Sequence, residues 1–243
     1  MKVINAHWEE RNLGHKAVEL IISEDDFEKE GIFEEIEDCS SDYTLIKLPV
    51  KNLHFMHKLQ DMDFYFLETQ IELCRNINNY ETPAWFKRFS DSVKIILHGK
   101  DKSVWKNTIA NLEPGMYSSD RFYLDPIYTP EVSFKRYKNW SEDLFNLEGC
   151  ELYTLNLGDK EIGQGIIQTR GEQCHSILGG IYNAFQGRGL GAMVVDAPLK
   201  IASEKGVSKC VTSVSSNNLI LRFYINFGYS INNMMYVLRR SRL

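Results

Sequence analysis

A glycine-rich loop is the part of the sequence whose residue types and spacing most clearly indicate chemistry. The stretch "NAFQGRGLGAM", residues 183–193, places Gly187, Gly189 and Gly191 at alternate positions, with Arg188 between the first two. Glycines in such a turn let backbone N–H groups approach an anion without an intervening Cβ. The positive end of the helical pattern that follows favours phosphate. We therefore predict a phosphate-binding loop, to which Arg188 adds a charge-assisted contact.

Two other classes of glycine loop fit the sequence less well. Gly187, Gly189 and Ala192 satisfy the dinucleotide pattern G-x-G-x-x-A, but only 52 residues follow Gly191, too few to complete that fold. The next strand, "KCVTSVS", also ends in serines where a ribose-binding acid is expected. A nucleoside triphosphate loop needs a Lys-Ser/Thr pair where residues 190–193 read LGAM. A glycine-rich turn without a ligand is the remaining alternative.

The elements around the loop follow a regular order. Two strands joined by a polar turn at 158–160 precede a third strand, which leads into the loop. Apolar residues then recur at helical spacing over 190–205, where Pro198 should introduce a kink or mark another boundary. A strand, a short helix and a last strand complete the chain. The order β-β-β-loop-α-β-α-β predicts an α/β domain with a mixed, mostly antiparallel sheet flanked by helices.

The first third of the chain has its own alternation of strands and helices. The segment "NINNYETP", residues 76–83, carries Asn, Thr and Pro with little apolar periodicity, which is typical of a linker. We therefore predict a small α/β N-terminal domain over 1–78 and a second domain over 79–243. A helix, an aromatic residue and a strand follow one another at 53–73 and again at 219–239. This echo indicates either an internal duplication or a coincidence.

Composition narrows the function classes. The net charge of −5 disfavours a nucleic-acid-binding protein, and no apolar run reaches membrane-spanning length. The N-terminus lacks the apolar core of a secretion signal, so we expect a cytoplasmic protein. Five scattered cysteines without a CxxC pair predict reduced, mostly buried thiols and no metal site.

Two motifs at the right mutual distance resemble those of the GNAT N-acetyltransferases. The stretch "QGRGLG", residues 186–191, is similar to the Q/R-x-x-G-x-G/A motif that binds the pyrophosphate of acetyl-CoA in that family. Downstream, Asn217, Tyr224, Gly228 and Tyr229 match the family pattern N-x6-Y-x3-G-F, with Tyr in place of the final Phe. The resemblance covers about residues 85–243. It implies the GNAT fold and acetyl-CoA as cosubstrate.

The same resemblance implies a set of coenzyme contacts. It places the backbone N–H that binds the thioester oxygen near Ile181 or Tyr182, on the strand before the loop. Asn217 would contact the pantetheine arm, although an asparagine just before a helix also serves as an N-cap. The expected coenzyme contacts are Ile181, Tyr182, Asn183, Gln186, Gly187, Arg188, Gly189, Leu190, Gly191, Ala192 and Asn217.

Tyr224 is the candidate general acid. A phenol with a pKa of about 10 is protonated at neutral pH and can give its proton to a departing thiolate. The alternative is that Tyr224 only packs in the core, as Phe223 and Phe227 do by their spacing. The general base stays unassigned. A water chain to backbone carbonyls or a carboxylate could take the proton, and His175, Glu151 and Glu172 are open candidates.

Three short stretches resemble the dTDP-fucosamine acetyltransferases more closely. They are "WEERNLG" near the N-terminus, "DRFYLDP" at 120–126, and residues 215–240. By this resemblance Arg121 would hold a substrate phosphate, and Phe122 or Tyr123 would stack on a base or a sugar. The alternative for this stretch is a structural Arg–Asp pair in a loop.

The expected reaction is acetyl transfer from acetyl-CoA to the primary amine of a small molecule. The closer resemblance favours the amino group of a nucleotide-linked amino-deoxysugar, a dTDP-sugar. Other acceptors remain as alternatives: a polyamine, an aminoglycoside or a protein N-terminus. A further alternative is that the protein binds coenzyme A without catalysing any transfer. The aromatic density of residues 116–140 suits a sugar or nucleotide face and equally a subunit interface, so a homodimer is also expected.

Overall fold

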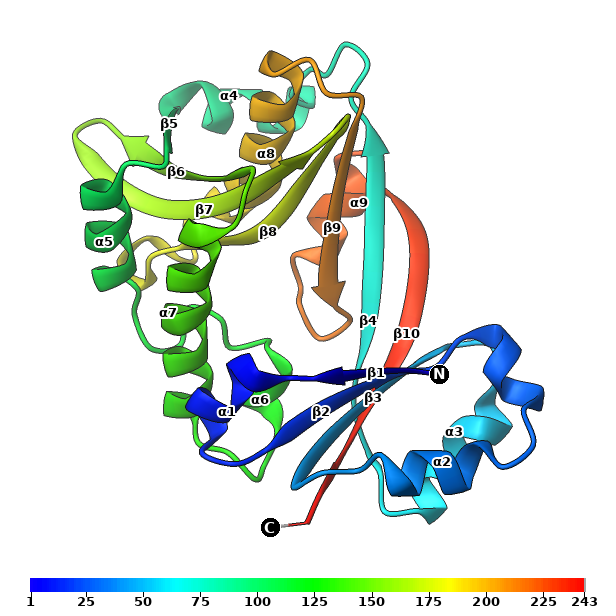
Figure 1. Cartoon of the computed structure of the whole chain (residues 1–243). Helices are drawn as coiled ribbons and strands as arrows, with labels where there is room; N and C mark the ends of the chain where they lie inside the picture. The colour runs from blue at the N-terminus through cyan, green and yellow to red at the C-terminus, as the bar shows by residue number, and fades with distance from the viewer. Residues whose placement is uncertain (243) are drawn as a thin grey trace.

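One continuous sheet runs through the whole of the described chain, residues 1–242 of this computed structural model (Figure 1). Its strand order is β1-β2-β3-β10-β4-β9-β8-β7-β6-β5. The strands are β1 (Lys2–Asn5), β2 (Ala17–Ile21), β3 (Tyr43–Pro49), β4 (Tyr65–Asn76), β5 (Val93–Gly99), β6 (Cys150–Leu157), β7 (Lys160–Arg170), β8 (Gln173–Ile181), β9 (Lys209–Ser215) and β10 (Ser230–Ser241).

Helices lie on both faces of this sheet. The α-helices are α1 (His7–Leu13), α2 (Ile32–Asp38), α3 (Leu53–Asp61), α4 (Ala84–Ser92), α5 (Lys102–Ala110), α6 (Arg121–Leu124), α7 (Pro130–Asn146), α8 (Met193–Glu204) and α9 (Leu221–Asn226). Short 3₁₀ turns are η1 (Glu24–Glu28), η2 (Asn183–Phe185) and η3 (Leu190–Ala192). Of the neighbouring strand pairs, β2–β3 and β8–β9 are parallel and the others antiparallel. The predicted α/β fold with a mixed, mostly antiparallel sheet is confirmed.

The two halves of the chain exchange a strand at the centre of the sheet. Figure 1 shows β4 and β10 running side by side through the middle of the molecule. β4 comes from the first half but also pairs with β9, and β10 comes from the second half but also pairs with β3. The helix–strand echo in the sequence corresponds to the units α3–β4 and α9–β10. The sheet therefore crosses the boundary proposed at residue 78, and the division into 1–78 and 79–243 stays a prediction.

Strands β6 to β8 carry different cores on their two faces. On one face, Tyr153 and Leu155 of β6 pack with apolar residues of α8. On the other, Cys150 and Leu152 pack with residues of α5 and α7. Side chains alternate along a strand, so Tyr153 and Leu155 lie on the face of β6 that is covered by α8, and Cys150 and Leu152 lie on the opposite face.

The structure also bears on the predictions for the turn at 158–160, for Pro198 and for the cysteines. The turn at 158–160 joins the antiparallel pair β6–β7, as predicted. Helix α8 continues through Pro198 to its end at Glu204, so the alternative of a boundary at this proline is wrong. The five cysteines are free thiols, three of them buried. Within residues 1–242, no helix combines the length and apolar composition needed to cross a bilayer.

Candidate functional site

The glycine loop lies between the end of β8 and the start of α8. Gly187 and Gly189 have φ values of +74° and +78°, a backbone region that L side chains rarely adopt. A Cβ added to Gly187 or Gly191 would meet no heavy atom within 4 Å, so the space over the loop is open. The exposed guanidinium of Arg188 lies over the ring of Phe185, 5.5 Å from its centroid. This is the strand–loop–helix arrangement predicted from the sequence.

Side chains just before the glycines hold the loop in place. Gln186 Nε2 donates to the carbonyl oxygen of Ile181 at 3.0 Å and to Asn183 Oδ1 at 3.2 Å. The backbone N–H of Asn183 donates to Glu113 Oε2 at 2.8 Å. Gln186 and Asn183 were predicted as coenzyme contacts, and the structure adds that they brace the loop.

Burial limits how other predicted contacts can reach a ligand. The side chains of Ile181, Tyr182, Leu190 and Ala192 are all buried. We therefore expect contacts of these residues with a coenzyme to use mainly their backbone atoms.

Strands β8 and β9 separate beside the loop. They pair in parallel only from Gln173–Lys209 to Ser176–Thr212, although β8 continues to Ile181 and β9 to Ser215. Backbone groups on that edge of β8 therefore lose the neighbour that would normally pair with them. In the gap between the two strands, a ligand could form the hydrogen bonds with β8 that β9 does not make.

The register of β8 against β7 decides which amides face this gap. The N–H of Tyr182 donates to the carbonyl oxygen of Ile162 at 2.9 Å, toward β7. Hydrogen bonding alternates along an antiparallel pair, so the amides of Gly179 and Ile181 point the other way, into the gap. Of the two amides predicted to bind the thioester oxygen, that of Tyr182 is already bonded within the sheet and that of Ile181 faces the gap. The amide of Gly179, a residue that the sequence did not single out, faces the same gap.

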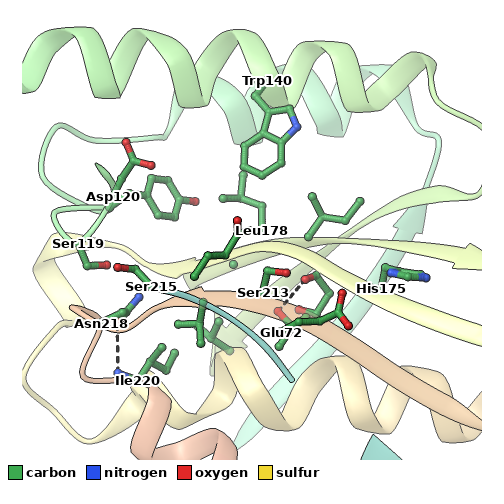
Figure 2. A pocket seen from close by; sticks show the side chains of 18 of the residues that line it. Glu72, Ser119, Asp120, Trp140, His175, Leu178, Ser213, Ser215, Asn218 and Ile220 are labelled. Atoms are coloured by element: carbon green, nitrogen blue, oxygen red, sulfur yellow. Dashed lines mark hydrogen bonds between the residues drawn. The ribbon is translucent and has the colours of Figure 1, made fainter. Parts of the chain in front are cut away.

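A cavity of ≈ 540 Å³ opens at the same gap. Its lining includes Gly179 of β8, Val214 of β9, Val194 of α8 and Tyr224 of α9. Figure 2 shows the indole of Trp140 projecting from α7 toward Leu178 in β8. The cavity thus extends from the α7 side of the sheet to the place where β8 and β9 part.

Tyr224 is buried, with 5% of its surface exposed, and it lines this cavity. Burial raises the pKa of its phenol to about 12, while hydrogen bonds with Thr212 and Ser176 act in the opposite direction. The ring packs edge-on against Tyr229 at a centroid distance of 5.1 Å. Tyr224 therefore both packs in the core and presents a protonated phenol to the cavity.

Asn217 is not the N-cap of helix α9. The helix begins at Leu221 with Ile220 at the N-cap position, and Asn217 is exposed further upstream. The neighbouring Asn218 accepts a hydrogen bond from the N–H of Ile220 at 3.0 Å and lines the cavity (Figure 2). The N-cap alternative for Asn217 is wrong because the helix starts one turn later than its sequence pattern indicates.

The segment 120–126 lies beside the cavity, but only part of it reaches inside. Arg121 lines the cavity, 3.5 Å from Glu68 Oε1, and its Nε has no hydrogen-bond partner among the described residues. Phe122 is fully buried and packs against Tyr43 and Tyr128. The prediction that Phe122 stacks on a base or a sugar is therefore wrong, because neither face of its ring is accessible. Tyr123 is not among the residues that line the cavity.

Two titratable groups of the cavity are candidates for the base. His175 and Glu72 both line it (Figure 2). Burial and the nearby Arg170 lower the pKa of His175, and Glu72 opposes them. Glu151 instead binds Lys205 at 2.6 Å. Glu68, Gln70 and Glu72 alternate along β4, so their side chains share one face of the strand. This pattern could have pointed to Glu72, but its meaning becomes clear only when β4 is known to border the cavity.

Aromatic residues from the stretch 116–140 also line the cavity. Tyr117 and Tyr137 stack at a centroid distance of 4.1 Å. Tyr137 Oη donates to Asp120 Oδ1 at 3.2 Å, and Gln164 Nε2 donates to Tyr117 Oη at 2.9 Å. The aromatic density noted in the sequence thus forms one wall of the cavity.

No protein family and no curated protein matches this chain by sequence. A GCN5-related N-acetyltransferase from Sphaerobacter thermophilus is similar in structure, with TM-score 0.62 and 11% identity over 98% of this chain and 75% of that one. A tandem GNAT protein from the clavulanic acid biosynthesis pathway has TM-score 0.51 and 10% identity over 92% and 74%.

A third similar structure is a glucosamine N-acetyltransferase region of a fungal multi-domain GH3 β-N-acetylglucosaminidase. It has TM-score 0.59 and 14% identity over 98% of this chain and 31% of that one. At such low identity these likenesses concern the fold. The protein has the GNAT acetyltransferase fold.

Proposed function

We propose that this protein is an N-acetyltransferase that moves the acetyl group of acetyl-CoA to the primary amine of an amino-deoxysugar. The observation that carries the proposal is the parting of β8 and β9 between the glycine loop and the cavity. It leaves the amides of Gly179 and Ile181 facing a gap between the phosphate-binding loop and the cavity.

The loop and the strand edge fit the two ends of one extended ligand. Backbone N–H groups of 187–191 and the N-terminus of α8 suit a pyrophosphate, with Arg188 available on the surface. The open edge of β8 suits the amide groups of a pantetheine arm, which would replace the missing β9 neighbour. Acetyl-CoA bound in this way would supply an activated acyl group at the cavity.

Residues at the gap and elsewhere in the cavity suit the steps of acetyl transfer. An amide of Gly179 or Ile181 would stabilise negative charge on the thioester oxygen, which typically lowers a barrier by about 2.7–4 kcal/mol. His175 would take a proton from the acceptor ammonium, so that the neutral amine attacks the acyl carbon. Tyr224 would give its proton to the departing thiolate as the C–S bond breaks. The proton that the attacking nitrogen then loses would return to the phenol through solvent. His175 suits this role because its lowered pKa leaves the imidazole neutral and able to accept a proton at pH 7.

The cavity wall supports a sugar as acceptor. It combines the ring of Trp140 with hydroxyl, amide and carboxylate groups, the mixture that polyhydroxylated ligands need. The glucosamine N-acetyltransferase region among the similar structures is consistent with this class. For a nucleotide-linked sugar such as a dTDP-sugar, the exposed Arg170 at the cavity is a better phosphate contact than Arg121, because Arg121 already faces Glu68.

A polyamine or aminoglycoside acceptor is the second candidate. Three carboxylates line the cavity, and a cluster of acid is what a polycation requires. Two of them already face arginines, Glu68 at 3.5 Å from Arg121 and Asp120 at 3.9 Å from Arg136. Glu72 accepts a hydrogen bond from Asn232 but faces no arginine, so it is the carboxylate left to bind a cation, which favours an acceptor with a single amine.

A binding panel followed by an acceptor panel tests the proposal. At about a hundred times its dissociation constant, a ligand stabilises a protein by about 2.7 kcal/mol, so coenzyme A and acetyl-CoA should raise the melting temperature where NAD and ATP do not. Thiol release should then be measured with amino sugars, dTDP-amino sugars, polyamines and aminoglycosides. Stabilisation by NAD alone would reject the proposal, and turnover of polyamines alone would reject the sugar.

A further inference from the structure

Tyr153 of strand β6 carries a buried hydroxyl group with no hydrogen-bond partner among the described residues. Its side chain is fully buried, on the face of the sheet that packs against α8. An unsatisfied buried hydroxyl typically costs about 1–3 kcal/mol, so a phenylalanine would be the more stable residue here. Within residues 1–242 nothing offsets this cost, so a bound ligand is the partner that we consider.

Two glycines allow the phenol to reach across the sheet. Tyr153 pairs with Gly165 of β7, and Gly165 pairs with Gly179 of β8. A Cβ on Gly165 would lie 2.2 Å from Tyr153 Oη, so any other residue there would push the phenol away. A Cβ on Gly179 would lie 3.4 Å from the same oxygen. Tyr153 thus crosses β7 and ends beside Gly179.

Gly179 borders the proposed acyl site. It lines the cavity, and its amide points into the gap between β8 and β9. A Cβ on Gly179 would also lie 2.7 Å from Val194 Cγ1. The Tyr153 hydroxyl and Val194 at the start of α8 therefore both pack closely against Gly179. Tyr224 lines the same cavity, and burial raises the pKa of Tyr153 so that its phenol stays protonated.

We infer that Tyr153 Oη donates a hydrogen bond to the thioester carbonyl oxygen of bound acetyl-CoA, as a second oxyanion donor beside the strand amide. A carbonyl oxygen can accept two hydrogen bonds. Here one would come from a backbone amide of β8, in the plane of the sheet, and the other from the Tyr153 phenol, on the side of the sheet that faces α8. The inference rests on the proposed function. It also explains why the hydroxyl is kept although the unliganded protein gains nothing from it.

The test is the variant Tyr153→Phe, which removes one oxygen and leaves the ring. Without ligand, its melting temperature should equal or exceed that of the wild type. Calorimetry should show acetyl-CoA affinity reduced several-fold and coenzyme A affinity unchanged, because only the acylated form carries the carbonyl. Removal of one oxyanion donor typically lowers kcat by about 10²–10³-fold, and this variant should fall in that range.

A spectroscopic readout separates this role from a packing role. The infrared carbonyl stretch of acetyl-CoA bound to wild type should shift to higher frequency in Tyr153→Phe as the hydrogen bond is lost. Tyr43→Phe is the control, because Tyr43 is equally buried but donates to Asp125 at 3.1 Å in the other half of the sheet. It should lower stability and leave both the carbonyl stretch and the two affinities unchanged.

The outcomes distinguish the inference from the function on which it rests. If the wild type binds neither acetyl-CoA nor coenzyme A, the proposed function fails and the inference fails with it. If the wild type binds both and Tyr153→Phe shows the same affinities and the same carbonyl stretch, only the inference is overturned. A clear loss of stability in the unliganded variant would likewise overturn it, by showing that the hydroxyl has a partner in the protein.

Discussion

Thr82 donates its hydroxyl hydrogen to the buried carboxylate of Asp196 at 2.8 Å, which joins the segment before α4 to helix α8. Tyr80 and Ser90 donate to the same carboxylate, and Lys200 Nζ lies 3.5 Å away. The connection therefore runs from the predicted linker to the helix that starts at the glycine loop. A buried charge so well supplied with donors is expected to stabilise the fold.

Replacing Asp196 with alanine should lower the free energy of unfolding by roughly 3 kcal/mol or more, because several buried donors lose their acceptor. Urea denaturation followed by circular dichroism would measure the loss. Asp91→Ala is the control, since Asp91 is exposed and forms only a surface pair with Lys87 at 3.7 Å. Equal stability of the two variants would show that the Asp196 network contributes nothing.

Tyr224→Phe should lower kcat by about 10²–10⁴-fold while leaving acetyl-CoA affinity nearly intact, because general acid catalysis acts on the leaving thiolate and not on binding. The pKa of about 12 places loss of the acidic proton well above neutral pH, so the wild type should keep its activity to pH 10. Turnover equal to the wild type in the variant would remove Tyr224 from the mechanism.

The acidic limb of the pH profile should come from His175. Its pKa is lowered below 6.5, chiefly by burial, so the imidazole is neutral and able to accept a proton throughout the range above that value. The wild-type kcat/KM should therefore be flat near pH 7 and fall only below pH 6.5. His175→Gln should remove that limb and lower kcat/KM by roughly 10²-fold. If Glu72→Gln removes the limb and His175→Gln does not, Glu72 is the base.

Gly189→Val should weaken coenzyme binding before it affects the fold. A β-branched residue at φ +78° costs on the order of 1–3 kcal/mol, and its Cβ would lie in van der Waals contact with the Phe89 ring at 3.7 Å. Gly158→Val is the matched control, because Gly158 has φ +59° in the β6–β7 turn, with no heavy atom within 4 Å. Both variants should lose similar stability, and acetyl-CoA affinity measured by calorimetry should fall in Gly189→Val alone.

Some of the candidate site could be predicted because its signals are local. The conformations of Gly187 and Gly189 and the strand–loop–helix order depend on neighbours within a few residues. The same holds for the β6–β7 hairpin. Local backbone preferences and hydrophobic periodicity report such features directly.

Other parts of the site depend on partners far along the chain. Phe122 has the same sequence context as the cavity residue Arg121, but its ring is enclosed by Tyr43 and Tyr128. Glu72 lines the cavity only because β4 is exchanged into the sheet next to β9.

By itself the sequence determined the glycine loop and the alternation of elements that leads to it, and it predicted phosphate binding there and Tyr224 as a proton donor. Only the tertiary structure decided that the amide of Tyr182 donates to Ile162, that those of Gly179 and Ile181 face the gap, and that Tyr153 ends beside Gly179. The physical reason is that a strand's hydrogen bonds and the side-chain contacts across it are set by the register with its neighbours. That register arises from long-range pairing and packing, which no short stretch of sequence specifies.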